Sequence, residues 1–508
     1  MKRSFADILA GLDGERAGKV ARKLPEWAAV DGIEIPSALA LEQCSSSVTA
    51  RFKAGLAAST LRSGQLPLKT SDCVGPLPSD DGPLPLTVPR VARFSGAVAA
   101  DVSPEAARLT TVLDLTGGLG VDSWAFSQVA ERVVYYERDA GLAAAAERDF
   151  TRLGADNIEV RCETVTPETD LPEADLIFAD PARRSATGRK VFLLEDCTPD
   201  ILTLLPLLLQ KAPAVLLKLS PMADLTMLSE RLGPALREIH VVEHDGEVKE
   251  LLCLLCRRSD FHPLHPLKGD GTQIIDARVR QRTPAEPEIA VVRLASGGAG
   301  APCGQNKRPR SAAETPAGGI LPAGAPNPAI LRFNPREERD AEAVYAASVE
   351  PGETLLEPCP ALLKAGAFRL PCKRWDLRKL APSTHLYLSP APSGTINPPG
   401  VPGSPLSAFP GTETGSSVPD SRFFKTWLVR EVLPFRAAAF KDLKQRCPRA
   451  EITARNLPLG SEELRKKMGI SPGGDAHIFA CRLTDGSAVL IVTERSPEEL
   501  PAASHPGA

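Results

Sequence analysis

The sequence predicts an α/β protein whose largest domain is built on a doubly wound, mostly parallel β-sheet. An apolar run that ends in Asp114 is followed by a glycine-rich turn over residues 116–120. A second apolar run ends before Glu137, and a later one ends before Asp180. In open α/β sheets the residues that follow successive strands gather along one edge, where such proteins bind ligands. These carboxylates therefore predict a ligand site at that edge.

Strands and helices are expected to alternate between residues 100 and 258. The expected strands are 112–115, 132–136, 158–161, 175–179, 214–219, 238–242 and 251–256. Helices are expected to begin near Asp122, Gly141, Pro199 and Asp224. The last two strands follow each other without a helix, which predicts an antiparallel strand added to a parallel sheet.

Three Pro- and Gly-rich stretches divide the chain: 63–90, 296–328 and 389–421. They contain too few apolar residues to offset the entropy of ordering, so we expect flexible insertions. The expected domains are a helical N-terminal region with the first insertion (1–90), the α/β core (91–258), a middle domain with the second (259–390), a flexible linker (391–421) and a small C-terminal α+β domain (422–496).

Composition limits the class of protein. The net charge of −3 over 508 residues gives no sign that the chain as a whole binds nucleic acid. Residues 1–8 lack the apolar segment of a signal peptide and no run is long enough to cross a bilayer, so we expect a cytoplasmic protein without membrane contact. Cys253 and Cys256 have redox or zinc spacing, but they lie in an apolar strand and no second Cys or His pair completes a site. We expect buried thiols and no metal.

The turn after the first strand has the features of a nucleotide cofactor site. Gly117, Gly118 and Gly120 permit a tight turn and allow backbone N–H groups to approach a ligand. The helix that starts near Asp122 would direct the positive end of its dipole toward that ligand. Glu137 follows about twenty residues after the turn, where a carboxylate can accept hydrogen bonds from both ribose hydroxyls.

The nearby charges favour S-adenosylmethionine over a dinucleotide. A dinucleotide brings a pyrophosphate, whereas S-adenosylmethionine carries a sulfonium and an ammonium group that prefer a carboxylate such as Asp114. Glu163 follows the third strand and could accept a hydrogen bond from the adenine amino group. The Asp-x-Thr-x-Gly-x-Gly turn, which includes Thr116, resembles the S-adenosylmethionine loop of class I methyltransferases. The alternative is a structural turn with surface acids.

Asp180-Pro181-Ala182-Arg183 marks the expected reaction face. It is placed like the (Asp/Asn)-Pro-Pro-(aromatic) motif of amino-group methyltransferases, in which polar oxygens hold the target nitrogen and the aromatic ring stacks on the base. Arginine at the aromatic position can still stack on a base or pair with phosphate. We expect Asp180 to orient the target, helped by Pro181, Arg183 and Lys218. Lys218 ends the fifth strand, where it could steer an anionic substrate, hold Asp180 or simply extend to solvent.

The chain resembles bacterial class I methyltransferases that carry a C-terminal THUMP-like domain. The resemblance is carried by residues 41–46, 49–53, 114–122, 180–184, 218–222, 249–252, 356–368, 384–387, 455–459 and 473–475. It implies a helical N-terminal region, a Rossmann-like methyltransferase core, a ferredoxin-like middle domain and a THUMP-like tail. It also implies S-adenosyl-L-methionine as cofactor and, because THUMP domains in general bind RNA, a structured RNA as partner.

Two further expectations follow from the motifs. Residues 422–495 hold fourteen Lys and Arg against eight Asp and Glu, which is consistent with an RNA-binding surface, although a solvated helix face is the alternative. The candidates for phosphate contacts are Lys425, Arg430, Arg436, Lys444, Arg465, Lys466 and Lys467. The N-terminal region, with Glu42 and Gln43, is expected to cover the cofactor site.

The sequence thus predicts an S-adenosylmethionine-dependent methyltransferase that acts on a base of structured RNA, such as rRNA or tRNA. A methyltransferase-like RNA-binding protein without transfer activity is the alternative that Ala182 and Arg183 leave open. A methyltransferase for small molecules or proteins is a third possibility, and a nicotinamide-dependent enzyme is the least favoured.

Overall fold

The computed structural model describes residues 14–62, 109–183, 194–257, 286–295, 328–390 and 420–495. These residues form two compact units. The first contains the described residues up to Arg237 together with 252–257, and the second contains 238–251, 286–295 and the described residues from 328 onward. The three predicted insertions lie almost wholly outside the described residues, so their flexibility stays a prediction.

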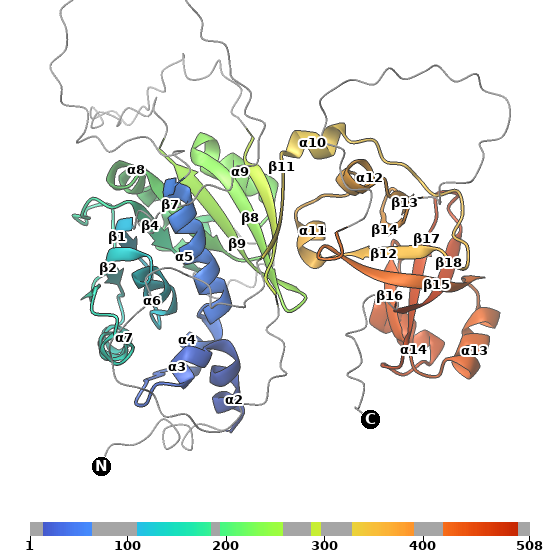
Figure 1. Ribbon diagram of the computed structural model, residues 1–508, viewed down its shortest axis with the longest axis horizontal. Coiled ribbons are helices and arrows are strands. Elements are labelled where there is room, and N and C mark those ends of the chain that lie inside the picture. The colour runs from blue at the N-terminus through green and yellow to red at the C-terminus, as the bar shows by residue number, and fades with distance from the viewer. Residues whose placement is uncertain are drawn as a thin grey trace, which may run out of the picture. The chain divides into compact units, whose positions relative to one another are not determined.

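The first unit is built on a mostly parallel sheet with the strand order β9-β7-β4-β1-β2-β3 (Figure 1). The strands are β1 (Leu109–Asp114), β2 (Ala130–Tyr136), β3 (Ile158–Arg161), β4 (Leu176–Ala179), β7 (Ala214–Leu219) and the end of β9 (Glu247–Cys256). β1 pairs in parallel with both β2 and β4, and β4 pairs in parallel with β7. Because the carboxyl ends of parallel strands meet at one edge, Asp114 lies at the centre of that edge.

The helices of the first unit begin within two residues of the predicted positions. They are α6 (Val121–Ser127), α7 (Ala140–Arg152), α8 (Ile201–Lys211) and α9 (Leu225–Leu232). Aspartates cap three of them, since the side chains of Asp139, Asp200 and Asp224 each accept a hydrogen bond from a first-turn N–H group. Such caps satisfy N–H groups that have no partner within the helix.

The N-terminal residues are helical, as predicted. They form α2 (Gly14–Lys23), α3 (Pro25–Ala28), α4 (Ala38–Gln43) and α5 (Ser47–Arg62). The fully buried Trp27 packs edge to face on Trp124 of α6, with 6.3 Å between ring centroids. Glu34 accepts hydrogen bonds from Arg148 and Arg152 of α7. The N-terminal helices are therefore attached to the α/β core through α6 and α7.

A hairpin supplies the predicted antiparallel strand. β8 (Leu236–His244) and β9 are sheet neighbours joined by the two-residue turn Asp245-Gly246, whose φ angles are 54° and 75°. Two-residue turns with positive φ connect antiparallel strands. Cys253 and Cys256 of β9 are buried, as expected from the apolar run, and burial raises the pKa of Cys253 to about 12.

The second unit extends β8 with two strands that were not predicted. β10 (Glu288–Arg293) pairs in parallel with β8, and β11 (Ala329–Phe333) pairs antiparallel with β10. Arg332 of β11 forms ion pairs with Glu238 of β8 and Glu288 of β10. Both strands fall in the range 259–390, for which the sequence suggested a separate middle domain.

A seven-stranded sheet, ordered β13-β14-β12-β15-β18-β17-β16, completes the second unit. Its strands are β12 (Thr354–Pro358), β13 (Arg378–Ala381), β14 (Thr384–Leu388), β15 (Phe424–Pro434), β16 (Glu451–Arg455), β17 (Ala476–Arg482) and β18 (Ala488–Arg495). Its helices are α10 (Pro335–Asp340), α11 (Pro360–Lys364), α12 (Leu370–Trp375), α13 (Ala437–Arg446) and α14 (Ser461–Met468). α13 and α14 bury Phe440, Leu443, Leu464 and Met468 in a core with β16, β17 and β18. None of the described helices has the length and apolar character required to cross a membrane.

Candidate cofactor-binding site

The glycine-rich turn after β1 is shaped by aromatic rings behind it. A Cβ atom on Gly117 would lie 2.0 Å from Cε2 of Tyr135, and one on Gly120 would lie 2.4 Å from Cζ of Phe150. Gly118 and Gly120 have φ angles of 56° and 82°, in the left-handed region that favours glycine. The hydroxyl group of Tyr135 donates a hydrogen bond of 2.6 Å to the carbonyl of Gly118. Packing and conformation thus require these glycines, in addition to the ligand approach that the sequence suggested.

Asp114 is a buried carboxyl group at the end of β1. It accepts hydrogen bonds from the backbone N–H of Thr116, at 3.1 Å, and from the hydroxyl of Ser123, at 2.6 Å. Burial, together with the nearby negative charges of Asp122 and Asp180, raises its pKa to about 7. A ligand cation beside Asp114 would therefore stabilise the ionised form at neutral pH.

Glu137 follows β2 and contacts the same turn. Its carboxylate accepts hydrogen bonds from the N–H groups of Gly118, at 2.9 Å, and Asp139, at 2.8 Å. These contacts fix the carboxylate beside the glycine turn, although it stays partly exposed. Glu163, which follows β3, is exposed to solvent.

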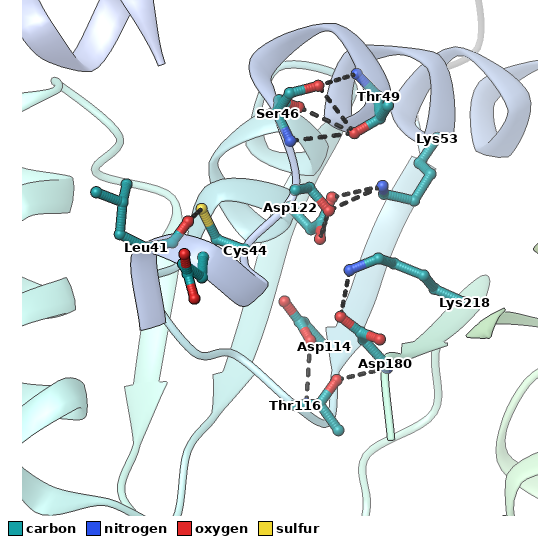
Figure 2. A network of polar contacts seen from close by, with 12 residues as sticks. Leu41, Cys44, Ser46, Thr49, Lys53, Asp114, Thr116, Asp122, Asp180 and Lys218 are labelled. Atoms are coloured by element: carbon teal, nitrogen blue, oxygen red, sulfur yellow. Dashed lines mark hydrogen bonds and ion pairs between the residues drawn. The ribbon is translucent and has the colours of Figure 1, made fainter. Parts of the chain in front are cut away.

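Asp180, the residue after β4, forms an ion pair with Lys218 of the neighbouring β7 (Figure 2). The pairing of β4 with β7 sets Ala179 beside Leu217, which brings the next residue of each strand together. The backbone N–H of Asp180 donates to the hydroxyl of Thr116 at 2.6 Å. The structure thus brings the glycine-rich turn, Asp180 and Lys218 together. Of the roles considered for Lys218, the structure shows the contact with Asp180.

The residues after Asp180 take an extended course. Pro181 is buried and Ala182 is exposed. Ala182–Arg183 forms the short strand β5, which pairs antiparallel with β6 (Cys197–Thr198). The expected stacking of the Arg183 side chain on a base stays a prediction.

Asp122 faces the N-terminal helices. Lys53 of α5 is fully buried, and its ammonium nitrogen lies 3.1 Å from one carboxylate oxygen of Asp122 (Figure 2). The hydroxyl of Ser45 donates a 2.7 Å hydrogen bond to the other oxygen and accepts one of 3.0 Å from Lys53. The sequence analysis placed Asp122 at the cofactor but missed Lys53. Its position between the apolar residues Ala50 and Ala54 could have indicated a buried lysine.

Another N-terminal side chain, that of Cys44, lies near Asp122 and Lys218. Burial raises the pKa of Cys44, while Lys23, Asp122 and Lys218 are close enough to influence it electrostatically. The ammonium of Lys23 donates hydrogen bonds of 2.8 Å to the carbonyls of Leu41 and Glu42. The Glu42 side chain pairs instead with the partly exposed Lys19 at 2.7 Å, and Gln43 is exposed. Cys44 and Ser45, rather than Glu42, are the members of this motif that face the core.

The basic residues proposed for RNA contacts divide into two groups. Arg430 pairs with Glu494, and Arg465 is partly buried between Glu451 and Glu462. The remaining five are exposed, and within the described chain no carboxylate lies at ion-pair distance from them: Lys425, Arg436, Lys444, Lys466 and Lys467. Lys444 of α13 and the two lysines of α14 lie on helices that pack together.

Comparisons with known proteins identify the C-terminal part. Residues 424–495 match the family described as THUMP domain-like, and residues 355–394 match a ferredoxin-like domain family. The chain carries a THUMP-like domain. This THUMP-like domain contains α13, α14 and β15 to β18, and the ferredoxin-like match contributes β12, β13 and β14 to the same sheet.

The fold of the chain with its THUMP-like domain is also found among solved structures. A proposed methyltransferase from Porphyromonas gingivalis W83 is 26% identical, with a TM-score of 0.61, and the match covers 95% of this chain and 88% of that one. The core therefore has the Rossmann-like fold of class I methyltransferases. Among curated proteins none matches the chain.

Shorter matches include two further methyltransferases. An rRNA methylase from Streptococcus thermophilus is 10% identical over 29% of this chain and 88% of its own, with a TM-score of 0.23. A 16S rRNA methyltransferase from T. thermophilus, in complex with AdoMet and guanosine, is 17% identical over 30% of this chain and 39% of its own, also with a TM-score of 0.23.

Proposed function

We propose that this protein is an S-adenosylmethionine-dependent methyltransferase that modifies a base of structured RNA, either rRNA or tRNA. One observation carries the proposal. Asp114 ends β1, and Glu137 and Asp180 directly follow the neighbouring strands β2 and β4. The carboxylates of Asp114 and Glu137 and the backbone N–H of Asp180 each form a hydrogen bond with a residue of one glycine-rich turn. The long match to a proposed methyltransferase supports the class of reaction.

The carboxylates suit S-adenosylmethionine better than a dinucleotide. Three acids around one turn would repel a pyrophosphate, but they can accept hydrogen bonds from an ammonium group and from ribose hydroxyls. Glu137 already accepts two N–H groups, and a carboxylate has about four acceptor positions. It therefore retains capacity for the ribose, while Asp114 is assigned to the ammonium group and Glu163 to the adenine amino group. The cofactor supplies an electrophilic methyl group.

Methyl transfer asks the protein mainly to align the nucleophile with the methyl group. Asp180 accepts a hydrogen bond from the target amino group, and the Pro181 carbonyl provides a second acceptor. Lys218 restrains the Asp180 carboxylate through their ion pair. Arg183 stacks on the target base or pairs with a phosphate.

RNA is the favoured substrate class because of the THUMP-like domain and its exposed lysines. Electrostatic binding of this kind weakens steeply with salt. If the substrate is a small molecule or a protein, residues 422–495 should show no salt-dependent affinity for RNA.

The alternative is an RNA-binding protein that holds the cofactor but transfers nothing, because Ala182 and Arg183 depart from the amino-methyltransferase motif. Incubation with methyl-tritiated S-adenosylmethionine and total bacterial RNA separates the two. The proposed enzyme labels RNA, and the Asp180→Ala variant does not. Cofactor binding without any label would support the alternative.

A further inference from the structure

Lys53 places a positive charge in the interior of the first unit. Its side chain is fully buried, although an ammonium group is costly to remove from water unless it is paired and hydrogen-bonded. The structure provides both kinds of partner, the carboxylate of Asp122 and the hydroxyl of Ser45. Removing one member of such a buried pair leaves the other charge uncompensated.

Asp122 lies where its position affects the cofactor site. It is the second residue of α6 and comes two residues after Gly120, so it belongs to the first helical turn. The next residue, Ser123, donates its hydroxyl to Asp114 at 2.6 Å. Because Asp122 and Ser123 are consecutive residues, the ion pair of Lys53 with Asp122 is linked through the backbone to the hydrogen bond of Ser123 with Asp114.

We infer that Lys53 is a positioning residue of the cofactor site, which fixes the first turn of α6 and thereby the glycine-rich turn and Asp114. This inference rests on the proposed function. It makes the N-terminal helices a working part of the site, because α5 supplies the charge that balances Asp122.

The same charge affects the titration of Asp114. Asp122 is one of the groups that raise the pKa of Asp114. Without Lys53, the charge of Asp122 would be uncompensated and would raise that pKa further. The other charged or titratable groups around this part of the site are Asp180, Lys218, Glu137, Tyr135, Cys44 and Lys23.

The test is calorimetric titration of S-adenosylhomocysteine, from about pH 5 to about pH 9, into four proteins. These are the wild type, Lys53→Met, Asp122→Asn and the double variant. We expect Lys53→Met to move the pH midpoint for binding upward. At neutral pH its binding should weaken about tenfold for each pH unit by which the midpoint rises. Asp122→Asn should move the midpoint downward, and the double variant should lie between the single variants.

Lys379→Met is the matched control. Lys379 is also a buried lysine, but it belongs to the second unit and donates to the Pro382 carbonyl at 2.7 Å. This variant should keep the wild-type midpoint. Hydrogen exchange provides a readout without cofactor, since amides of residues 117–124 should exchange about tenfold faster in Lys53→Met than in the wild type.

Unchanged binding, midpoint and exchange in Lys53→Met would overturn the inference. Equal weakening at every pH, with faster exchange throughout the first unit, would also overturn it, because the role would then be structural only. If the wild type fails to bind S-adenosylhomocysteine, the proposed function fails. Exchange then decides about Lys53 alone: faster exchange confined to residues 117–124 supports the positioning role, and unchanged exchange refutes it.

Discussion

The ammonium group of Lys218, near the end of β7, forms an ion pair with the carboxylate of Asp180, the residue after β4. Both side chains are at least partly shielded, with 12% and 34% of the side-chain surface exposed. A charge-assisted hydrogen bond of this kind restricts the orientation of both groups. Lys218 is therefore placed to hold Asp180, the proposed acceptor for the substrate, and this distinguishes its expected effect from that of a cofactor ligand.

Lys218→Met should lower the rate of methyl transfer and, at about pH 9, where Asp114 is ionised, leave cofactor affinity nearly unchanged. A misplaced catalytic group can cost about 100-fold in rate, and loss of the ion pair frees the Asp180 carboxylate. Initial rates of label transfer to RNA, together with calorimetric titration of S-adenosylhomocysteine, measure the two effects. Equal loss of rate and of cofactor affinity would instead assign Lys218 to the cofactor.

Cofactor affinity should rise with pH until the carboxyl group of Asp114, with its pKa of about 7, is fully ionised. Below that pH the neutral acid must lose a proton to bind an ammonium group, so affinity falls about tenfold per pH unit. Asp114→Asn should bind weakly with a flat pH profile. A wild-type profile without a step near neutral pH would contradict the role of Asp114.

The stability of the free protein should show the opposite trend. The folded pKa of Asp114 exceeds the ordinary value of 3.8, so the folded chain retains a proton that the unfolded chain has lost. The contribution of Asp114 is fully present below pH 3.8 and is lost as pH rises to about 7. Relative to wild type, Asp114→Asn should therefore gain stability as pH rises across this window. Urea unfolding at several pH values measures the difference, and parallel curves for the two proteins would contradict it.

Gly120→Ala should destabilise the protein more than Gly154→Ala. Both glycines have positive φ angles, of 82° and 69°, so both alanines carry backbone strain. A Cβ on Gly120 would also meet Phe150 at 2.4 Å, whereas one on Gly154 has no atom within 4 Å. The excess should be about 1–3 kcal/mol, the usual cost of overpacking. Denaturant unfolding of the two variants tests this, and equal losses would show that the ring does not restrict the turn.

Replacement of Lys466 and Lys467 by Ala should weaken RNA binding and reduce its dependence on salt. Each phosphate contact that is lost lowers the salt slope by about one. Fluorescence anisotropy with a labelled structured RNA at several salt concentrations measures the slope. Lys249→Ala is a suitable control, because Lys249 pairs with Glu247 on β9. An unchanged slope in the double variant would exclude this surface of α14 from RNA binding.

The sequence predicted helices and strands well where the hydrophobic pattern lies within a single segment. β3 and β7 occupy their predicted ranges, 158–161 and 214–219. β10 and β11 were missed, because they depend on partners that are distant in the sequence: β10 pairs with β8, and β11 pairs with β10. Periodicity within a segment does not specify such partners.

The candidate site shows the same difference between local sequence signals and contacts between distant segments. The strand-end carboxylates were visible in the sequence because polar residues after apolar runs mark the ligand edge of an α/β sheet. The pairing of Lys53 with Asp122 joins residues 69 positions apart and was not visible. Nor could the sequence show that Glu494 and Glu451 would engage Arg430 and Arg465.

Titration of S-adenosylhomocysteine into the wild type and Asp114→Asn at about pH 8 tests the central claim most directly. We expect one molecule to bind per wild-type chain and the folded variant to bind far more weakly. Absence of binding by the wild type, or equal binding by both, would contradict the assignment of this strand edge to S-adenosylmethionine.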